Sequence, residues 1–238
     1  MTRCLVSLGS NQEDPNAHLD AAEQGLRQLT EPGSYRGSKR ITTAPVGGPL
    51  GQESYINAAA AFETRLSASE LLVELQRLER RQERVRTRRW DARSLDLDLL
   101  LYGETVIDTL DLRVPHPRMT FRPFVLVPAC EIAADWRHPE CDRTLGEFLP
   151  ILELGRDAIS VLQDTDAKVE AIVRAERPGL AVEAGRQAVP PRLTIDASPR
   201  RSPLDPCGPR LVLADCPREH WRDEILAALQ CVWPQNPA

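Results

Sequence analysis

The chain has 238 residues, which is enough to bury a full hydrophobic core in one domain or in one domain with an appendage. Its formal net charge is −5, from 30 Lys and Arg against 35 Asp and Glu, and this disfavours a nucleic-acid-binding protein, which usually presents a basic surface. The six cysteines show no zinc-type spacing, the N-terminus does not resemble a signal peptide, and no uncharged stretch is long enough to span a bilayer. We therefore expect a cytoplasmic monomer with reduced thiols and with neither nucleic acid nor a membrane as a partner.

Strands and helices are expected to alternate over the first part of the chain, with two consecutive strands in the middle. Asp14 with Pro15 and Ser67 with Glu70 are typical helix starts, because the first residue of each pair can cap free backbone N–H groups. This order fits an α+β, ferredoxin-like sandwich with an antiparallel sheet better than a doubly wound parallel sheet. Strands are expected at residues 4–8, 38–43, 55–64 and 95–101, short extended pieces within 106–114, a short helix or buried run at 124–132 and a helix at 144–154.

Leucine and aspartate alternate at the end of an arginine-rich stretch that carries one tryptophan. Side chains alternate between the two faces of a strand, so Leu95, Leu97 and Leu99 are expected on one face. Asp96 and Asp98 then lie together on the other. Magnesium takes carboxylate and phosphate oxygens, and arginines donate to phosphates, so this stretch suggests a metal and nucleotide site. The plainer interpretation is the wet face of an amphipathic strand beside a solvated basic loop.

Three further segments have more than one interpretation. His116 lies between Pro115 and Pro117 on a stiffened turn, where a histidine can be catalytic or simply packed. The Pro/Gly-rich loop at residues 44–51 is suited to lie over a ligand. Gly9-Ser10-Asn11 follows a strand as a phosphate-binding loop does, but the further glycines and the lysine of such loops are missing, so we interpret it as a structural turn.

The C-terminal part of the chain differs in composition from the rest. Prolines and small residues are dense between residues 177 and 210, and we find no repeat and no catalytic constellation there. We expect this tail to be dispensable for chemistry. The predicted division is a domain of residues 1–160, a helix and Pro-rich linker at 161–191, and a small α/β appendage at 192–238 of unknown role, with strands at 192–196 and 210–214 and a helix at 220–232.

Four separated motifs together resemble the 6-hydroxymethyl-7,8-dihydropterin pyrophosphokinase family of folate biosynthesis, over about residues 2–154. The resemblance implies a ferredoxin-like sandwich, ATP as cosubstrate with magnesium, and transfer of a pyrophosphoryl group to the pterin hydroxymethyl with release of AMP. The motifs are Gly9-Ser10-Asn11, Tyr55-Ile56-Asn57-Ala58, Arg89-Trp90-Asp91-Ala92-Arg93-Ser94-Leu95-Asp96-Leu97-Asp98-Leu99-Leu100, and Val114-Pro115-His116-Pro117-Arg118 followed by Arg122 and Phe124.

The resemblance also implies a set of site residues. Asp96 and Asp98 would hold two magnesium ions, and Arg84, Arg86 and Arg93 would complete the catalytic set. The implied ATP contacts are Gln76, Glu79, Arg84, Arg93, His116 and Arg122, and the implied pterin contacts are Thr43, Ala44, Val46, Tyr55, Asn57, Trp90 and Phe124. Plainer interpretations are core packing for the two stacking aromatics, Tyr55 and Phe124, and a solvated helix face for Gln76 and Glu79.

One departure from the family pattern and two rival functions complete the sequence-based interpretation. Asp91-Ala92 stands where the family commonly has a pair containing Gly or Pro, and it places a negative charge in the loop expected to approach ATP. The first rival is another metal-dependent nucleotidyl or phosphoryl transferase that uses the same acidic pair. The second is a noncatalytic ferredoxin-like binding module in which the site residues persist only structurally.

Overall fold

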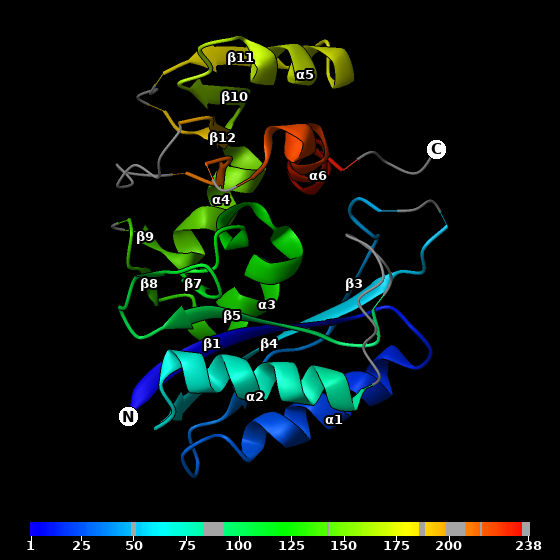
Figure 1. Ribbon diagram of the computed structural model, residues 1–238, viewed down its shortest axis with the longest axis vertical. Coiled ribbons are helices and arrows are strands. Elements are labelled where there is room, and N and C mark those ends of the chain that lie inside the picture. The colour runs from blue at the N-terminus through cyan, green and yellow to red at the C-terminus, as the bar shows by residue number, and fades with distance from the viewer. Residues whose placement is uncertain are drawn as a thin grey trace.

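The computed structural model describes residues 1–48, 51–82, 93–141, 143–185, 189–198, 208–214 and 216–234. Within these ranges the fold is mixed α/β, with a five-stranded antiparallel sheet and a four-stranded parallel sheet as its two largest sheets (Figure 1). No helix in the described ranges combines the length and the apolar character needed to cross a membrane.

The elements in chain order are β1 (Thr2–Ser10), α1 (Pro15–Arg27), β2 (Arg36–Gly37), β3 (Ile41–Thr43), β4 (Tyr55–Thr64), α2 (Ala68–Arg81), β5 (Asp96–Tyr102), β6 (Ile107–Asp108), β7 (Arg113–Val114), η1 (Met119–Phe121), α3 (Pro123–Ala133), β8 (Arg137–His138), β9 (Arg143–Thr144), η2 (Leu145–Glu147), α4 (Phe148–Leu154), β10 (Arg156–Leu162), α5 (Lys168–Glu176), β11 (Ala181–Ala184), β12 (Pro191–Asp196), β13 (Arg210–Val212), η3 (Arg218–His220) and α6 (Trp221–Val232).

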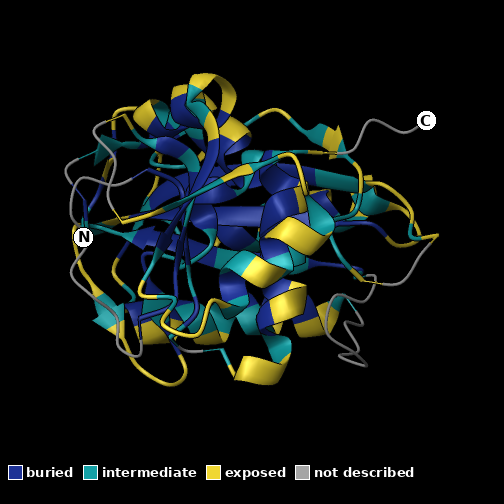
Figure 2. Ribbon diagram, turned by 90° about the horizontal axis from the view of Figure 1, so that it is seen from above, coloured by how far each residue is buried: buried dark blue, intermediate teal, exposed yellow. Residues whose placement is uncertain are grey.

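The antiparallel sheet has the strand order β2-β4-β1-β5, and β3 also pairs with β4. Strand β1 lies between β4 and β5, and its residues Cys4, Leu5 and Val6 are fully buried. Helices α1 and α2 cover one face of this sheet and α3 covers the other (Figure 1). Figure 2 shows the buried strands in the centre, with helices that expose one side to solvent.

Both predicted helix starts are confirmed. The Asp14 carboxylate accepts hydrogen bonds from two backbone N–H groups at the start of α1, each at 3.1 Å. Ser67 and Glu70 form a capping box at the start of α2, in which each side chain accepts from the backbone N–H of the other residue. These caps satisfy N–H groups that have no partner inside their own helix.

One expected strand is shorter than predicted. The sequence favoured a strand over residues 38–43, whereas β3 contains only Ile41–Thr43 and a separate two-residue strand, β2, precedes it. Ser38 lies between them, and its side-chain hydroxyl accepts the N–H of Ala59 at 2.8 Å. Because a side-chain oxygen takes an N–H that a strand backbone would otherwise pair, regular pairing is interrupted at this residue.

The C-terminal residues form a parallel sheet with the strand order β11-β10-β12-β13. Strand β10 crosses the boundary expected at residue 160, and β11 lies inside the expected linker. Strand β12 pairs with β10, so the appendage expected at 192–238 shares one sheet with residues before it. Short strands that directly follow a helix show little periodicity of their own, and the strands with which they pair are distant in sequence. Such strands are therefore hard to predict from the sequence alone.

The parallel sheet packs onto the first part of the chain through one hydrophobic cluster. Phe121, Leu126 and Phe148 belong to this cluster, together with Leu193 and Ile225 from the C-terminal part. We call it the shared cluster. Figure 1 shows α4 and α6 between α3 and the parallel sheet.

Replacing Leu75 by alanine tests the apolar stripe of α2. Leu75 is fully buried against the sheet, whereas Val73 on the same helix is 55% exposed. We expect Leu75→Ala to lower the free energy of unfolding by about 2–5 kcal/mol, and Val73→Ala to change it by less than about 0.5 kcal/mol. Urea denaturation of both variants measures the difference, and equal effects would contradict the packing of Leu75 against the sheet.

Candidate active site

Polar residues gather at one end of the sheet face that α3 covers. Gly9 pairs in register with Asn57 on one side and with Asp96 on the other, so three neighbouring strands bring these residues side by side. Side chains alternate along a strand, which places Asn57 on the same face as Ala59 and places Asp96 with Asp98. The predicted alternation is confirmed, because Leu95, Leu97 and Leu99 are buried and both aspartates are partly exposed.

A first pocket opens beside Asp96, and every predicted pterin contact in the described ranges lines it. Asn57 Nδ2 donates a hydrogen bond to Thr43 Oγ1 at 2.9 Å, which fixes the amide at the pocket wall. A Cβ on Gly9 would lie only 3.3 Å from Asn57 Oδ1, so the glycine leaves room for this amide. The pocket is lined by Gly9, Thr43, Ala44, Val46, Gln52, Tyr55, Asn57, Arg93, Asp96, Arg122 and Phe124.

A second pocket opens beside Asp98. Asp98 and His116 are the two predicted site residues in its lining. The segment from Leu110 to Arg113 also contributes, and sequence reasoning missed it because only two short extended pieces were recognisable there. Asp96 and Asp98 therefore lie between two pockets, one on each side. The second pocket is lined by Leu72, Leu97, Asp98, Leu99, Leu110, Asp111, Leu112, Arg113, His116 and Pro117.

Arg93 forms an ion pair with the first aspartate. Its Nη1 donates to Asp96 Oδ2 at 2.6 Å, and its backbone N–H donates to Asn11 Oδ1 at 2.8 Å. The N–H of Asn11 in turn donates to the Arg93 carbonyl at 3.1 Å. Burial lowers the pKa of Arg93, but the neighbouring charges, with Asp96 the largest, outweigh burial and raise it above its ordinary value. Asn11, which directly follows β1, thus holds the backbone of a site arginine. Gly9 and Ser10 are paired residues of β1, so the turn predicted at Gly9-Ser10-Asn11 is wrong.

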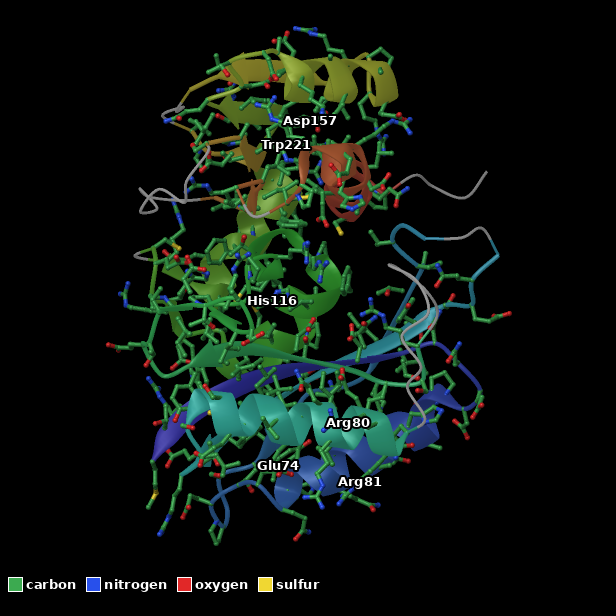
Figure 3. The ribbon with its side chains drawn as sticks, viewed as in Figure 1. Glu74, Arg80, Arg81, His116, Asp157 and Trp221 are labelled. Carbon is green, nitrogen blue, oxygen red and sulfur yellow. The ribbon has the colours of Figure 1, made fainter. Side chains whose placement is uncertain are left out.

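His116 lies against the second aspartate as a neutral imidazole. Burial, followed by the charges of Arg122 and Arg118, lowers the pKa of His116 to about 3. The Arg118 backbone N–H donates to His116 Nδ1 at 3.3 Å, so the ring proton is assigned to Nε2, which lies 3.7 Å from Asp98 Oδ2. Figure 3 shows His116 on the side of the sheet opposite helix α2.

Glu79 is buried, so a solvated helix face is the wrong interpretation for it. Only 4% of the residue is exposed, and its Oε1 accepts the backbone N–H of Leu97 at 2.9 Å. Leu97 is the residue between the two aspartates, on a strand at the edge of the sheet. The Glu79 carboxylate therefore holds the backbone that carries the acidic pair. Gln76, on the same helix, is partly exposed.

The N-terminus of α3 faces the first pocket. Arg122 is the N-cap residue of this helix, and its guanidinium carbon lies 5.5 Å from the centre of the Phe124 ring. Both side chains line the pocket. A helix N-terminus carries partial positive charge, which adds to the charge of Arg122 and favours an anionic group here.

The predicted roles of Arg84, Arg86 and Trp90, and the proposed effect of Asp91, fall on residues outside the described ranges.

The aspartate pair suits magnesium that is completed by a substrate. The Asp96 and Asp98 side chains are 25% and 34% exposed and lie on one face of β5. Over the described ranges there is no group of three or more His, Cys, Asp or Glu residues placed to hold a metal ion. Magnesium commonly binds one or two carboxylates together with substrate phosphates and water, and these two carboxylates fit that pattern.

Comparison with known proteins places the chain in a family. A family model described as 7,8-dihydro-6-hydroxymethylpterin-pyrophosphokinase (HPPK) matches residues 5–134. The 2-amino-4-hydroxy-6-hydroxymethyldihydropteridine pyrophosphokinase of Haemophilus influenzae is 45% identical over 135 residues, which are 57% of this chain and 84% of that protein. The protein of the same name from Pseudomonas aeruginosa is 40% identical over 150 residues, covering 63% of this chain and 89% of that protein. The chain belongs to the 7,8-dihydro-6-hydroxymethylpterin-pyrophosphokinase family, as the four motifs predicted.

A solved structure is similar in fold. The chain matches wild-type Plasmodium falciparum HPPK-DHPS with pteroate at a TM-score of 0.50 and 10% identity, over 96% of this chain and 61% of that one. The chain thus spans less than two thirds of that protein, and at this identity the likeness concerns the fold alone.

Replacing Glu79 tests its role beneath the acidic pair. Glu79→Ala removes the acceptor of a buried N–H, so we expect a loss of about 1–3 kcal/mol in the free energy of unfolding, whereas Glu79→Gln keeps an acceptor oxygen and most of the stability. Glu74→Ala on the same helix is the control, because Glu74 forms a surface ion pair with Arg77 at 3.6 Å, and such pairs contribute little to stability. An effect of Glu79→Ala no larger than that of Glu74→Ala in urea denaturation would refute the role.

Proposed function

We propose that this chain transfers pyrophosphate from ATP to the hydroxymethyl group of 6-hydroxymethyl-7,8-dihydropterin and releases AMP, in tetrahydrofolate biosynthesis. Membership of the family supports the reaction. The observation that carries it is the acidic pair between two pockets, with Asp96 in the wall of the first and Asp98 in the wall of the second. A transfer between two substrates requires that the donor and the acceptor meet beside the groups that neutralise the phosphate charge, and this arrangement meets that requirement.

We assign the first pocket to the pterin. Asn57 and Thr43 offer amide and hydroxyl groups to the donor and acceptor edge of the ring, and Tyr55 and Phe124 offer aromatic faces for stacking. Ala44 and Val46 would contribute the wall formed by the loop after β3, and Trp90 remains a predicted contact. In this pose the hydroxymethyl group points toward Asp96 and the second pocket.

We assign the second pocket, together with the cationic groups around the acidic pair, to ATP. The pterin hydroxyl oxygen attacks the β-phosphorus and loses its proton to solvent, the bond from that phosphorus to the bridging oxygen of the α-phosphate breaks, and the electron pair of this bond leaves with AMP. Asp96 and Asp98 would hold two magnesium ions, and bound magnesium would neutralise phosphate charge and align the reacting oxygens. Arg93, Arg122 and the Nε2–H of His116 would contact phosphate oxygens, with Arg84 and Arg86 as further predicted contacts.

The two residues predicted on helix α2 are proposed for different roles. Gln76 is partly exposed and stays a predicted ATP contact. Glu79 already accepts the Leu97 N–H, so we propose that it contributes to ATP binding indirectly, by holding the strand that carries both aspartates.

We further propose that the first part of the chain is a ferredoxin-like sandwich. The strand order β5-β1-β4, with β2 and β3 beyond β4, supports this assignment, as do antiparallel neighbours throughout and two helices on one face.

Use of ATP supports a cytoplasmic location. The monomeric state stays a prediction from the sequence.

Asp96→Asn and Asp98→Asn test the metal assignment. We expect either change to lower kcat by about 100-fold or more, because a neutral amide holds magnesium poorly, while Asp135→Asn on the exposed surface leaves kcat unchanged. AMP and pterin diphosphate are quantified together, and a chelator should abolish turnover until magnesium is restored. Full turnover by both site variants would exclude the metal site. If the wild-type protein releases ADP, it is the rival metal-dependent transferase. If the folded wild-type protein shows no turnover, it is the rival binding module.

Asn57→Ala tests the pterin pocket. Loss of the buried amide should raise the KM for the pterin about 10-fold, with the KM for ATP within about twofold, since Asn57 lines the first pocket and not the second. Thr42→Ala is the control, because Thr42 is an exposed residue beside Thr43 on β3. Steady-state kinetics with each substrate varied separately gives both constants, and an equal rise in the two would argue against the assignment.

A further inference from the structure

Helix α6 reaches the loop that lines the first pocket. Gly47 follows the pocket residue Val46, and its backbone N–H donates to Gln230 Oε1 on α6 at 2.9 Å. Figure 1 shows the loop after β3 rising toward the end of α6. The contact joins segments that are 183 positions apart in the sequence.

Apolar packing joins the same two regions. Val46 and Phe124, both in the wall of the first pocket, pack against the shared cluster, which includes Leu229 and Cys231 of α6. Burial raises the pKa of Cys231 to about 11, and the positive charge of Arg122 partly opposes this rise. The C-terminal helix therefore forms the layer directly behind the pocket wall.

A partly buried ion pair joins α6 to Arg118, two residues after His116 of the second pocket. Arg118 Nε and Nη2 donate to Glu224 Oε2 and Oε1 at 3.0 and 2.8 Å, and Glu224 is only 2% exposed. This two-pronged pairing fixes the arginine in position and orientation. The Arg118 backbone N–H in turn donates to His116 Nδ1, which leaves Nε2 as the ring nitrogen directed at Asp98.

We infer that α6 positions the active site, with Gln230 holding the loop of the pterin pocket and Glu224 holding Arg118 and, through it, His116. The inference rests on the proposed function. Gln230 and Glu224 are positioning residues, since neither lines either pocket. This proposed role of α6 replaces the expectation that the tail is dispensable for chemistry. A tail that is merely attached would contribute stability to the protein without altering the kinetic constants of one substrate.

Gln230→Ala tests the contact with the pterin pocket in the full-length chain. Gln230 is exposed, so the variant should fold. We expect the KM for the pterin to rise about 3- to 10-fold, as for loss of one hydrogen bond, with kcat and the KM for ATP within about twofold. Gln230→Glu keeps an acceptor oxygen and should restore the wild-type KM.

Arg222→Ala is the matched control for Gln230→Ala. Arg222 is exposed on the same helix, and its ion pair is with Glu176 of α5, away from both pockets. It should leave all constants unchanged. An unchanged pterin KM in Gln230→Ala, or the same change in Arg222→Ala, overturns the role of Gln230.

Glu224→Gln tests the contact with His116. We expect the ¹⁵N shifts of the His116 ring, assigned with a His116→Gln sample, to move toward a mixture of tautomers, while the other histidines keep theirs. If Glu224→Gln does not fold, Arg118→Lys gives the same readout, because lysine keeps the charge but not the two-pronged pairing. Unchanged His116 shifts in a folded variant overturn the role of Glu224.

The proposed function and the role of α6 can be refuted separately. A wild-type protein that makes no AMP refutes the proposed function, and pterin affinity and the His116 shifts still report whether α6 positions the pocket. A wild-type protein that turns over normally, with variants that match it in every readout, refutes only the role of α6.

Discussion

The mutual repulsion of two carboxylates is the constraint around which this site is built. Asp96 and Asp98 lie on one face at the end of an edge strand, where like charges destabilise the fold unless they are balanced. Arg93 balances the first carboxylate, and Asn11 holds the backbone of Arg93. His116 lies near the second carboxylate but is neutral, so it adds no positive charge. The pair therefore keeps negative charge to offer to a cation, and the buried carboxylate of Glu79 secures the strand beneath it.

The charges around the pair are arranged in layers. Below it, α2 supplies a buried carboxylate to a backbone N–H, and above it, α3 directs its positive N-terminus and Arg122 toward the first pocket. An anionic substrate that bridges the pockets would meet cationic groups on its outer side and magnesium on its inner side. Such an arrangement allows several phosphate charges to be balanced at once. No single group then has to carry an unpaired charge while fully buried.

Local patterns predicted the parts of the structure that depend on neighbouring residues. The alternation around Asp96 and the caps at Asp14 and Ser67 follow from strand periodicity and from helix ends, so the sequence alone was sufficient. The buried contact of Glu79 with Leu97, the second pocket's wall near Leu110, and the pairing of β10 with β12 depend on segments that meet only in the folded chain. The residues that line the first pocket were grouped together from motifs, because the family resemblance supplied the tertiary information that periodicity lacks.

The shared cluster has a consequence for how the protein loses its structure. Phe121, Leu126 and Phe148 from the first part are buried together with Leu193 and Ile225 from the second, so separating the two parts would expose apolar surface on both. Unfolding of either part is thereby coupled to unfolding of the other, and a chain cut after Leu154 would leave the α3 and α4 side of the cluster in water. A substrate that binds the first pocket would, by the same linkage, also raise the melting temperature of the parallel sheet, which it does not touch.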